Sequence, residues 1–162
     1  MRETAADLER LQALLDDSLA RASPFLRSSF QMPELSLSAE RLVARLEGSL
    51  TVALATVTAR GEPRVAPVAA MFLRGAFHVP TVAESARARH VARRPGVSVT
   101  YFEGTDLAVV AHGRAAIVAA ADPDFAGLDA AQVACGNQSV TAWRGEGVYL
   151  RVEAASLFTF AR

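Results

Sequence analysis

The feature that most limits the fold of this chain is a succession of short apolar segments joined by tight turns. The first three segments are residues 50–58, 63–73 and 76–80. Glycine lies in both of the short connections, and β-branched side chains are frequent in the segments, as is typical of strands joined in hairpins. Strands with such short connections must run antiparallel, because a parallel connection needs a crossover of about a dozen residues or more.

The strand pattern continues through the second half of the chain. Further segments of strand character are residues 97–102, 107–118, 148–152 and 157–160. A short helix is expected between them, around 128–134. The strand at 50–58 is apolar or small on both faces and needs cover on both sides, which the interior of a barrel and outer helices or a partner subunit would supply. The sequence therefore predicts a mainly β fold, an antiparallel split barrel with flanking helices.

The first 48 residues have a different pattern, with leucines at helical spacing over 5–22. We expect an amphipathic helix there, then a linker that contains Pro24 and Pro33. A second helix is predicted to begin at the cap Ser38 and to end near Gly48. Residues 1–48 are thus expected to form a helical extension that packs on the barrel domain, residues 49–162, and covers the barrel or a dimer contact rather than acting as a lid.

Composition excludes several classes of protein. The 162 residues suit one domain, and no apolar run approaches the length of about 18 residues that a membrane span needs. The first residues are polar, unlike a signal peptide, so a cytoplasmic location without membrane contact is expected. The net charge of +0 disfavours nucleic acid as a partner. A single cysteine and three histidines without ligand spacing disfavour a metal site.

Arginines gather in the segment 84–95, which follows the third expected strand. We expect Ser85 to cap a helix that runs to about Arg94, because the next residue is proline. Arg93 and Arg94 then fall in the last turn, where the negative end of the helix dipole favours cations. These two arginines need no ligand to explain them.

Arg87 and Arg89 lie at the opposite end of this helix, where the same dipole disfavours a cation by about 0.3 to 1 kcal/mol. A phosphate would reverse that sign, since it would accept hydrogen bonds from backbone donors, the Ser85 hydroxyl and two guanidinium groups. Pairing of one arginine with Glu84 is the structural alternative, and the sequence leaves both open. A polynucleotide site is disfavoured because no aromatic residue interleaves the arginines.

The order of these pieces is similar to that of a known family. The pieces are a strand, a glycine turn, a strand with Pro67-Val68, a short strand ending near Thr81, then Ser85-x-Arg87-x-Arg89, Pro95-x-Val97-Ser98 and Gly113-Arg-Ala115. Together they resemble the pyridoxamine 5'-phosphate oxidase-like family of flavin-binding split barrels. The resemblance covers roughly residues 42–118, with weaker support from 148–160.

The resemblance implies a homodimer with the cofactor at the subunit interface and a small-molecule substrate. In such proteins the strand that matches residues 64–68 lines the isoalloxazine ring, and a polar set holds the phosphate. The implied ring-flanking residues are Arg64, Val65, Ala66, Pro67 and Val68. The implied phosphate-binding residues are Thr81, Ser85, Arg87 and Arg89. Proline inside a strand fits a bulge or an edge facing the cofactor, and a plain edge-strand position is the alternative.

Two departures from the family pattern shape the functional expectation. The arginine and tryptophan segment that helps pyridoxamine phosphate oxidases bind their vitamin has no counterpart in residues 158–162, and the extension 1–48 exceeds the minimal barrel. The chain is therefore more similar to the smaller reductases of the family, some of which use FMN and others an 8-hydroxy-5-deazaflavin. The expected function is hydride transfer between such a cofactor and a small substrate, and the alternative is a non-catalytic haem-binding or cofactor-binding protein.

Other candidate residues have simpler interpretations. Trp143 could stack on a flat ligand, but a loop anchor packed on the barrel explains it as well. His78 and His112 could donate protons or bind haem, and each could equally be a satisfied or surface histidine. No catalytic nucleophile and base, and no pair of carboxylates, is apparent, which suits a protein whose cofactor carries the chemistry.

Overall fold

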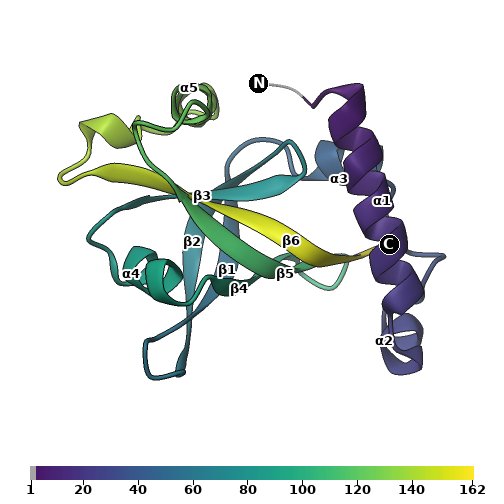
Figure 1. The fold of residues 1–162 in the computed structure, drawn as a ribbon. Helices are drawn as coiled ribbons and strands as arrows, with labels where there is room; N and C mark the ends of the chain where they lie inside the picture. The colour runs from purple at the N-terminus through teal and green to yellow at the C-terminus, as the bar shows by residue number, and fades with distance from the viewer. Residues whose placement is uncertain (1–2) are drawn as a thin grey trace.

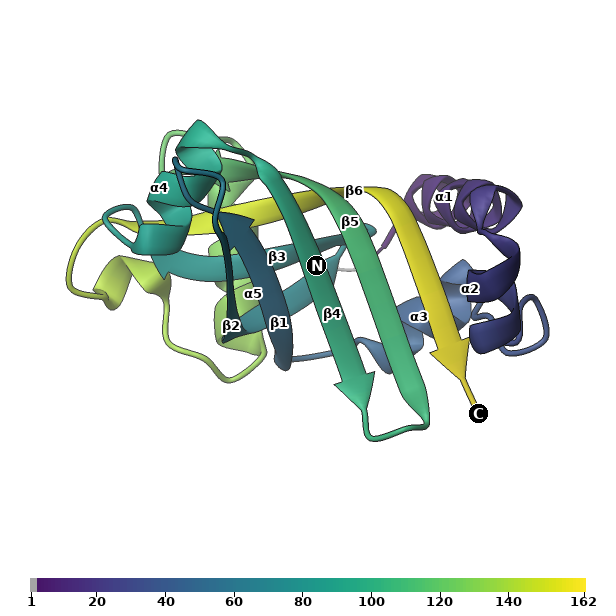
Figure 2. The same cartoon turned by 90° about the horizontal axis from the view of Figure 1, so that it is seen from below.

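The computed structural model describes residues 3–162 and contains a closed, six-stranded antiparallel barrel (Figures 1 and 2). The strands are β1 (Leu50–Val57), β2 (Pro63–Leu73), β3 (Ala76–Val82), β4 (Gly96–Glu103), β5 (Leu107–Val118) and β6 (Gly147–Ala161). Around the barrel they follow the order β1-β2-β3-β6-β5-β4, and β4 pairs with β1 to close it. The mainly β barrel with flanking helices predicted from the sequence is confirmed.

The barrel is opened locally where β2 and β3 separate. The pairing of these two strands is limited to 71–73 of β2 against 76–78 of β3, next to their hairpin turn. Earlier residues of β2 pair with β1 alone, in an unbroken register from Leu50 opposite Ala70 to Val57 opposite Pro63. β3 instead continues along β6. The first half of β2 therefore forms an edge, with a gap between it and β3.

β6 is one long strand where the sequence predicted two. It pairs with β5 along nearly its whole length, and a shift of register between His112 and Gly113 divides that pairing. A side chain at Gly113 would begin 2.0 Å from the carbonyl oxygen of Glu153, so only glycine permits this close approach. The irregularity bends the strands without ending them, which is how β-bulges act in barrels.

Three helices precede the barrel: α1 (Ala5–Arg21), α2 (Pro24–Ser29) and α3 (Ala39–Arg45). α1 and α3 agree with the two predicted helices, but part of the expected linker is helical. Ser23 caps α2 through a bond to the amide of Leu26, and Pro24 occupies its first turn. Proline is favoured at that position because its missing N–H would have no partner there.

The amino-terminal helices share the main apolar core with the barrel. Leu11 and Leu15 of α1 belong to the same buried cluster as Phe77 and Val79 of β3. Figure 2 shows α1 and α3 at one end of the barrel, beside the final part of β6. The extension thus supplies side chains that the barrel core packs against.

Two further helices lie between strands. α4 (Ala86–Arg93) joins β3 to β4, and α5 (Phe125–Ala134) with the short turn η1 (Val140–Ala142) lies between β5 and β6. α5 begins three residues earlier than predicted and packs Phe125 and Leu128 into a second, smaller apolar cluster. Within residues 3–162, no helix combines the length and apolar character needed to cross a membrane.

Candidate functional site

The start of α4 holds a connected set of polar side chains. Ser85 is the cap of this helix, as predicted, and its hydroxyl oxygen accepts from the backbone amide of Ala88 at 3.2 Å. The same oxygen accepts from the Thr81 hydroxyl at 3.0 Å, and Thr81 in turn accepts from Nη1 of Arg87 at 3.2 Å. Thr81 is only 3% exposed, so this set is anchored in the barrel wall rather than in a mobile surface loop.

Two cavities meet at this polar set. The first has a volume of about 480 Å³ and lies between the open edge of β2 and α4, with Leu54 and His90 among its lining residues. The second, of about 550 Å³, occupies the gap between β2 and β3 and reaches the loop after α5. Ser85 and Arg87 line both cavities. A ligand that filled both would pass directly over the start of α4.

The structure gathers eight of the nine predicted cofactor-binding residues around these cavities. Those on the first cavity are Arg64, Val65 and Ala66; those on the second are Pro67, Val68 and Thr81; Ser85 and Arg87 are on both. Arg89 lines neither. The predicted ring-flanking strand and the predicted phosphate-binding residues are therefore neighbours in space, although about 20 residues separate them in the chain.

Arg89 is engaged elsewhere. Its Nη1 donates to the backbone carbonyl oxygen of Glu84, and the side chain is exposed. The carboxylate of Glu84 forms no ion pair with an arginine anywhere in the described chain 3–162, so the pairing considered as the structural alternative does not occur. Neither Arg87 nor Arg89 forms an ion pair among residues 3–162, and of the two only Arg87 lines the cavities.

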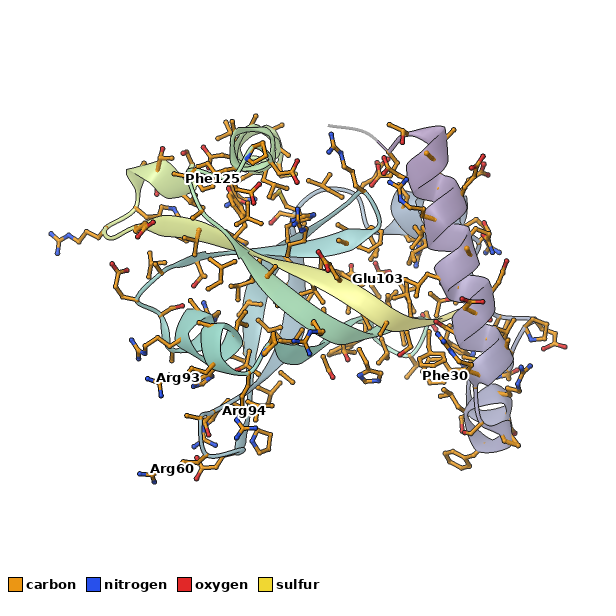
Figure 3. The ribbon with its side chains drawn as sticks, viewed as in Figure 1. Phe30, Arg60, Arg93, Arg94, Glu103 and Phe125 are labelled. Carbon is orange, nitrogen blue, oxygen red and sulfur yellow. The ribbon has the colours of Figure 1, made fainter. Side chains whose placement is uncertain are left out.

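Arg93 and Arg94, at the end of α4, line neither of the two cavities. Arg94 donates through Nη2 to the carbonyl oxygen of Ala59 at 3.2 Å and so ties the helix end to the turn between β1 and β2. Arg93 is exposed and takes part in no ion pair among residues 3–162. Figure 3 shows both side chains on the outer side of the molecule, near Arg60.

The open strand β2 presents an unusual surface. Val65 is 71% exposed and Pro67 is also exposed, whereas Val68 is buried in the core. Pro67 lies opposite Ala53 in a regular register, so the bulge considered for this proline is absent and it occupies an edge. The guanidinium of Arg64 is held by the Glu62 carboxylate at 2.7 Å. The strand therefore offers backbone and small apolar groups to whatever covers it.

The electrostatics of the two cavities favour an anion. Their described lining residues include two arginines and no aspartate or glutamate. The α4 amino terminus adds its own positive potential. Ser85 accepts two hydrogen bonds, and its hydroxyl hydrogen has no acceptor within residues 3–162, so it can donate to a ligand. These donors match the acceptor-rich phosphate of a cofactor.

Some lining residues were not identified from the sequence. His90 lies one helical turn after Arg87, and its Nδ1 contacts the Thr56 hydroxyl of β1 at 2.9 Å. The spacing of three residues on one helix could have indicated His90, but its partner on β1 depends on tertiary contacts. Trp143 is half-buried against the smaller apolar cluster and also lines the second cavity, so both interpretations offered for it describe part of its position. Within residues 3–162, no cluster of three or more histidine, cysteine, aspartate or glutamate side chains is placed to bind a metal ion.

Comparisons with known proteins agree with the barrel fold. A family model described as pyridoxamine 5'-phosphate oxidase matches residues 38–158. No curated protein matches the sequence. Among solved structures, a conserved hypothetical protein from Mycobacterium tuberculosis is 21% identical with a TM-score of 0.65, over 80% of this chain and 88% of that one.

Two other solved structures share the fold. A protein described as an F420 reductase is 18% identical with a TM-score of 0.57, over 70% of this chain and 93% of that one. A FAD-binding protein from Mesorhizobium loti is 18% identical with a TM-score of 0.59, over 76% of this chain and 93% of that one. Identities this low establish a common fold.

Proposed function

Because the chain belongs to the pyridoxamine 5'-phosphate oxidase-like family, we propose that it is a flavin- or deazaflavin-dependent oxidoreductase. It transfers hydride between a phosphate-bearing cofactor, FMN or 8-hydroxy-5-deazaflavin, and a small planar substrate. The observation that carries the proposal is the hydrogen-bonded set of Thr81, Ser85 and Arg87 at the junction of two cavities whose described lining residues include no carboxylate. Proteins of the same fold described as F420 reductase and as FAD-binding support a flavin-type cofactor.

The protein's own residues bind and orient the cofactor, which when bound supplies the hydride chemistry. The Arg87 guanidinium and the Ser85 hydroxyl donate to the phosphate, and Thr81 holds both side chains in place. Residues 64–68 of β2 flank the ring through backbone groups and small side chains. Arg89 has a weaker part in this arrangement, because its guanidinium already donates to the Glu84 carbonyl.

The active form is proposed to be a cytoplasmic homodimer with the cofactor at the subunit interface. The unpaired edge of β2 and the 71% exposed Val65 support this form, since both leave groups that a second subunit would cover. Light scattering of the purified protein measures its mass directly. A monomer at all concentrations that still bound the cofactor tightly would contradict the interface site.

The absorption spectrum of the purified protein tests the proposed function. Bound FMN gives a flavin spectrum, and a colourless protein that takes up added deazaflavin identifies the other cofactor. A Soret band would instead indicate the non-catalytic haem-binding alternative. If neither flavin nor deazaflavin binds, the proposed function is wrong.

A further inference from the structure

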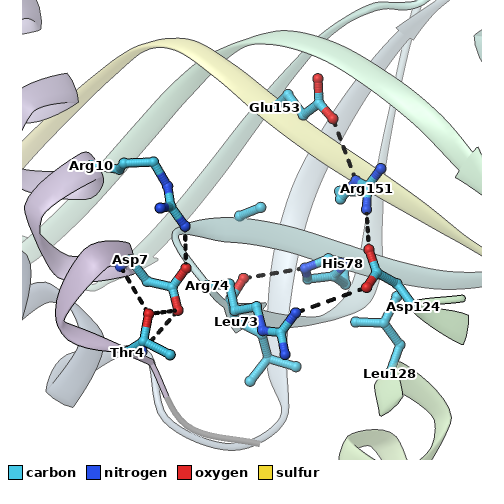
Figure 4. Close-up of a pocket in the computed structure, with 11 residues that line it drawn as sticks. Thr4, Asp7, Arg10, Leu73, Arg74, His78, Asp124, Leu128, Arg151 and Glu153 are labelled. Atoms are coloured by element: carbon cyan, nitrogen blue, oxygen red, sulfur yellow. Dashed lines mark hydrogen bonds and ion pairs between the residues drawn. The ribbon is translucent and has the colours of Figure 1, made fainter. Parts of the chain in front are cut away.

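A third cavity, of about 500 Å³, is lined by charged side chains that bind one another (Figure 4). Arg151 donates to the carboxylate of Asp124 at 2.8 Å, and Arg10 is bound by Asp7 of its own helix. Nδ1 of His78 and Nε of Arg151, opposite each other in the pairing of β3 with β6, have no hydrogen-bond partner within residues 3–162. Both atoms are enclosed by protein, so a ligand in this cavity could not contact them.

The second cavity, in the gap between β2 and β3, has a different lining. Arg87 is the one charged residue among the described residues that line it. Its β2 and β3 side is mostly apolar, with Pro67 and Val68 among its residues. The facing wall comes from the end of α5 and the loop that follows, and consists of three carboxamides and an indole: Gln132, Asn137, Gln138 and Trp143.

Gln132 brings an accessible hydrogen-bond acceptor to this wall. The residue is only 3% exposed, and its Nε2 donates to the backbone carbonyl oxygen of Gln138 at 3.4 Å. Because a carbonyl only accepts, this contact identifies the nitrogen and so the position of Oε1. Oε1 has no partner within residues 3–162, and it is not enclosed by protein as the unpartnered atoms of His78 and Arg151 are. A ligand in the second cavity can therefore reach it.

The end of α5 places a second carboxamide beside Gln132. Gly136 has a φ of 81° and turns the chain back, so that its amide donates to the carbonyl of Val133 and the amide of Asn137 donates to that of Gln132. These two bonds form a Schellman cap, which fixes the backbone of Asn137 against the last turn of the helix. The half-buried Asn137 side chain makes no hydrogen bond among residues 3–162, so its amide group is available to a ligand.

An uncharged polar wall favours an uncharged ligand. A charged group that enters a cavity loses hydration, and carboxamides supply no opposite charge to compensate for that loss. The exception is Arg87, which the proposed cofactor phosphate binds. Carboxamides instead pair with N–H and C=O groups, and an indole such as that of Trp143 offers flat apolar surface. The wall therefore suits a planar ligand that has both an N–H donor and a carbonyl acceptor.

We propose that the second cavity binds the substrate and that the substrate is an uncharged planar lactam, a ring in which N–H lies beside C=O. The N–H donates to Gln132 Oε1, and the carbonyl accepts from the amide group of Asn137. Pro67 and Val68, which flank the cofactor ring in the proposed function, line the same cavity, so a substrate bound here lies next to that ring. The inference rests on the proposed function and adds the chemical class of the substrate.

Calorimetric titration of the cofactor-loaded protein with three related probes tests this class. 2-Quinolone is an uncharged lactam, quinoline lacks the N–H and the carbonyl, and quinoline-2-carboxylate adds a negative charge. We expect 2-quinolone to bind at least about tenfold more tightly than either of the others. Equal binding of quinoline, tighter binding of the carboxylate, or absence of heat with 2-quinolone at millimolar concentration would each overturn the inference. The absorption spectrum of the same sample reports the cofactor separately, so failure of the proposed function is distinguishable.

Two variants locate the site. Gln132→Met keeps the length of a buried side chain without its carboxamide and should weaken 2-quinolone binding about tenfold or more, with quinoline binding unchanged. Asn137→Ala, at a half-buried position outside the apolar core, should also weaken 2-quinolone binding, by about three- to tenfold.

The matched control is Arg144→Ala, an exposed position of the same connection to β6 that does not line the cavity. It should leave 2-quinolone affinity unchanged, and all three variants should bind FMN, or the deazaflavin if that is the cofactor found, like the wild type. Unchanged 2-quinolone affinity in Asn137→Ala or in a folded Gln132→Met, or an equal loss in Arg144→Ala, would contradict the assignment of the lactam to this wall.

Discussion

The surroundings of Arg87 and those of Arg151 show how neighbours decide what an arginine is available to do. Arg87 has a hydroxyl partner and lines cavities with no carboxylate among their described residues, whereas Arg151 lies between Asp124 and Glu153 in a cavity with equal numbers of arginines and carboxylates. The polar groups around Arg87 bind one another, but His78 and Arg151 each keep a buried atom unpartnered among residues 3–162. The first region suits an anion, whereas the arginines and carboxylates of the second are mostly paired with one another.

The largest expected effect is a loss of folding stability at acidic pH, which arises from His78 beside Arg151. Because burial lowers the pKa of His78 to about 4, below its ordinary value of 6.5, the unfolded state binds more protons between these values. The contribution to stability is complete above pH 6.5 and falls by about 3 kcal/mol as pH drops to 4. Urea unfolding at several pH values measures it. His78→Gln should lose this part of the pH dependence, and identical profiles for both proteins would contradict the buried neutral histidine.

The next largest effect is expected on cofactor affinity, in the region around Arg87. Arg87→Gln should weaken binding of the phosphate-bearing cofactor by about 10- to 100-fold, since hydrogen bonds to charged groups contribute about 1.5 to 3 kcal/mol. Fluorescence titration with FMN, or with the deazaflavin if that is the cofactor found, measures the affinity. Arg93→Gln is the matched control, because this arginine of the same helix is exposed and lines neither cavity. Similar affinities in the two variants would remove the distinction drawn between the ends of α4.

A smaller effect is expected at the buried hydroxyl of the first region. Thr81→Val removes the donor to Ser85 and the acceptor of Arg87 while keeping the side-chain shape. The unfolding free energy should fall by about 1 kcal/mol, as for a typical hydrogen bond, and cofactor affinity should fall by less than in Arg87→Gln. Thr81→Ser, which keeps the hydroxyl, should restore most of both. A variant Thr81→Val that is equal to wild type in both measurements would show that this threonine does not position its neighbours.

The smallest effect should be at Arg89. Its guanidinium donates to the Glu84 carbonyl and lies outside both cavities, so Arg89→Gln should change cofactor affinity less than about threefold. The same fluorescence titration measures this change. A loss as large as that in Arg87→Gln would show that Arg89 turns toward the phosphate on binding.

The strands were the most predictable part of the fold. Hairpin turns as short as Arg74-Gly75 force adjacent strands to be antiparallel, and both residues of this turn have positive φ, as a two-residue hairpin connection requires. The continuity of β6 was not predictable, because residues 153–156 have little strand preference and are held by pairing with β5 across the bulge. α2 was missed because Pro24 was interpreted as the end of one helix and not as the start of another.

The candidate site was predictable in part. The cap Ser85 and the cation Arg87 follow from helix chemistry in a single segment, and the structure places them beside strand 64–68 as the family resemblance implies. Their role in binding a cofactor remains a prediction. The contact of His90 with Thr56 and the unpartnered atoms of His78 and Arg151 arise from tertiary packing, which spacing along one sequence does not reveal.

The affinities of FMN and of riboflavin, which lacks the phosphate, test most directly whether Arg87 binds the cofactor phosphate; a deazaflavin with and without its phosphate serves if that cofactor is found. In the wild-type protein the phosphate-bearing form should bind at least about tenfold more tightly. In Arg87→Gln this ratio should fall toward one, because only the phosphate-bearing form loses a partner. An equal ratio in wild type and variant would contradict the account, since the phosphate would then be bound elsewhere.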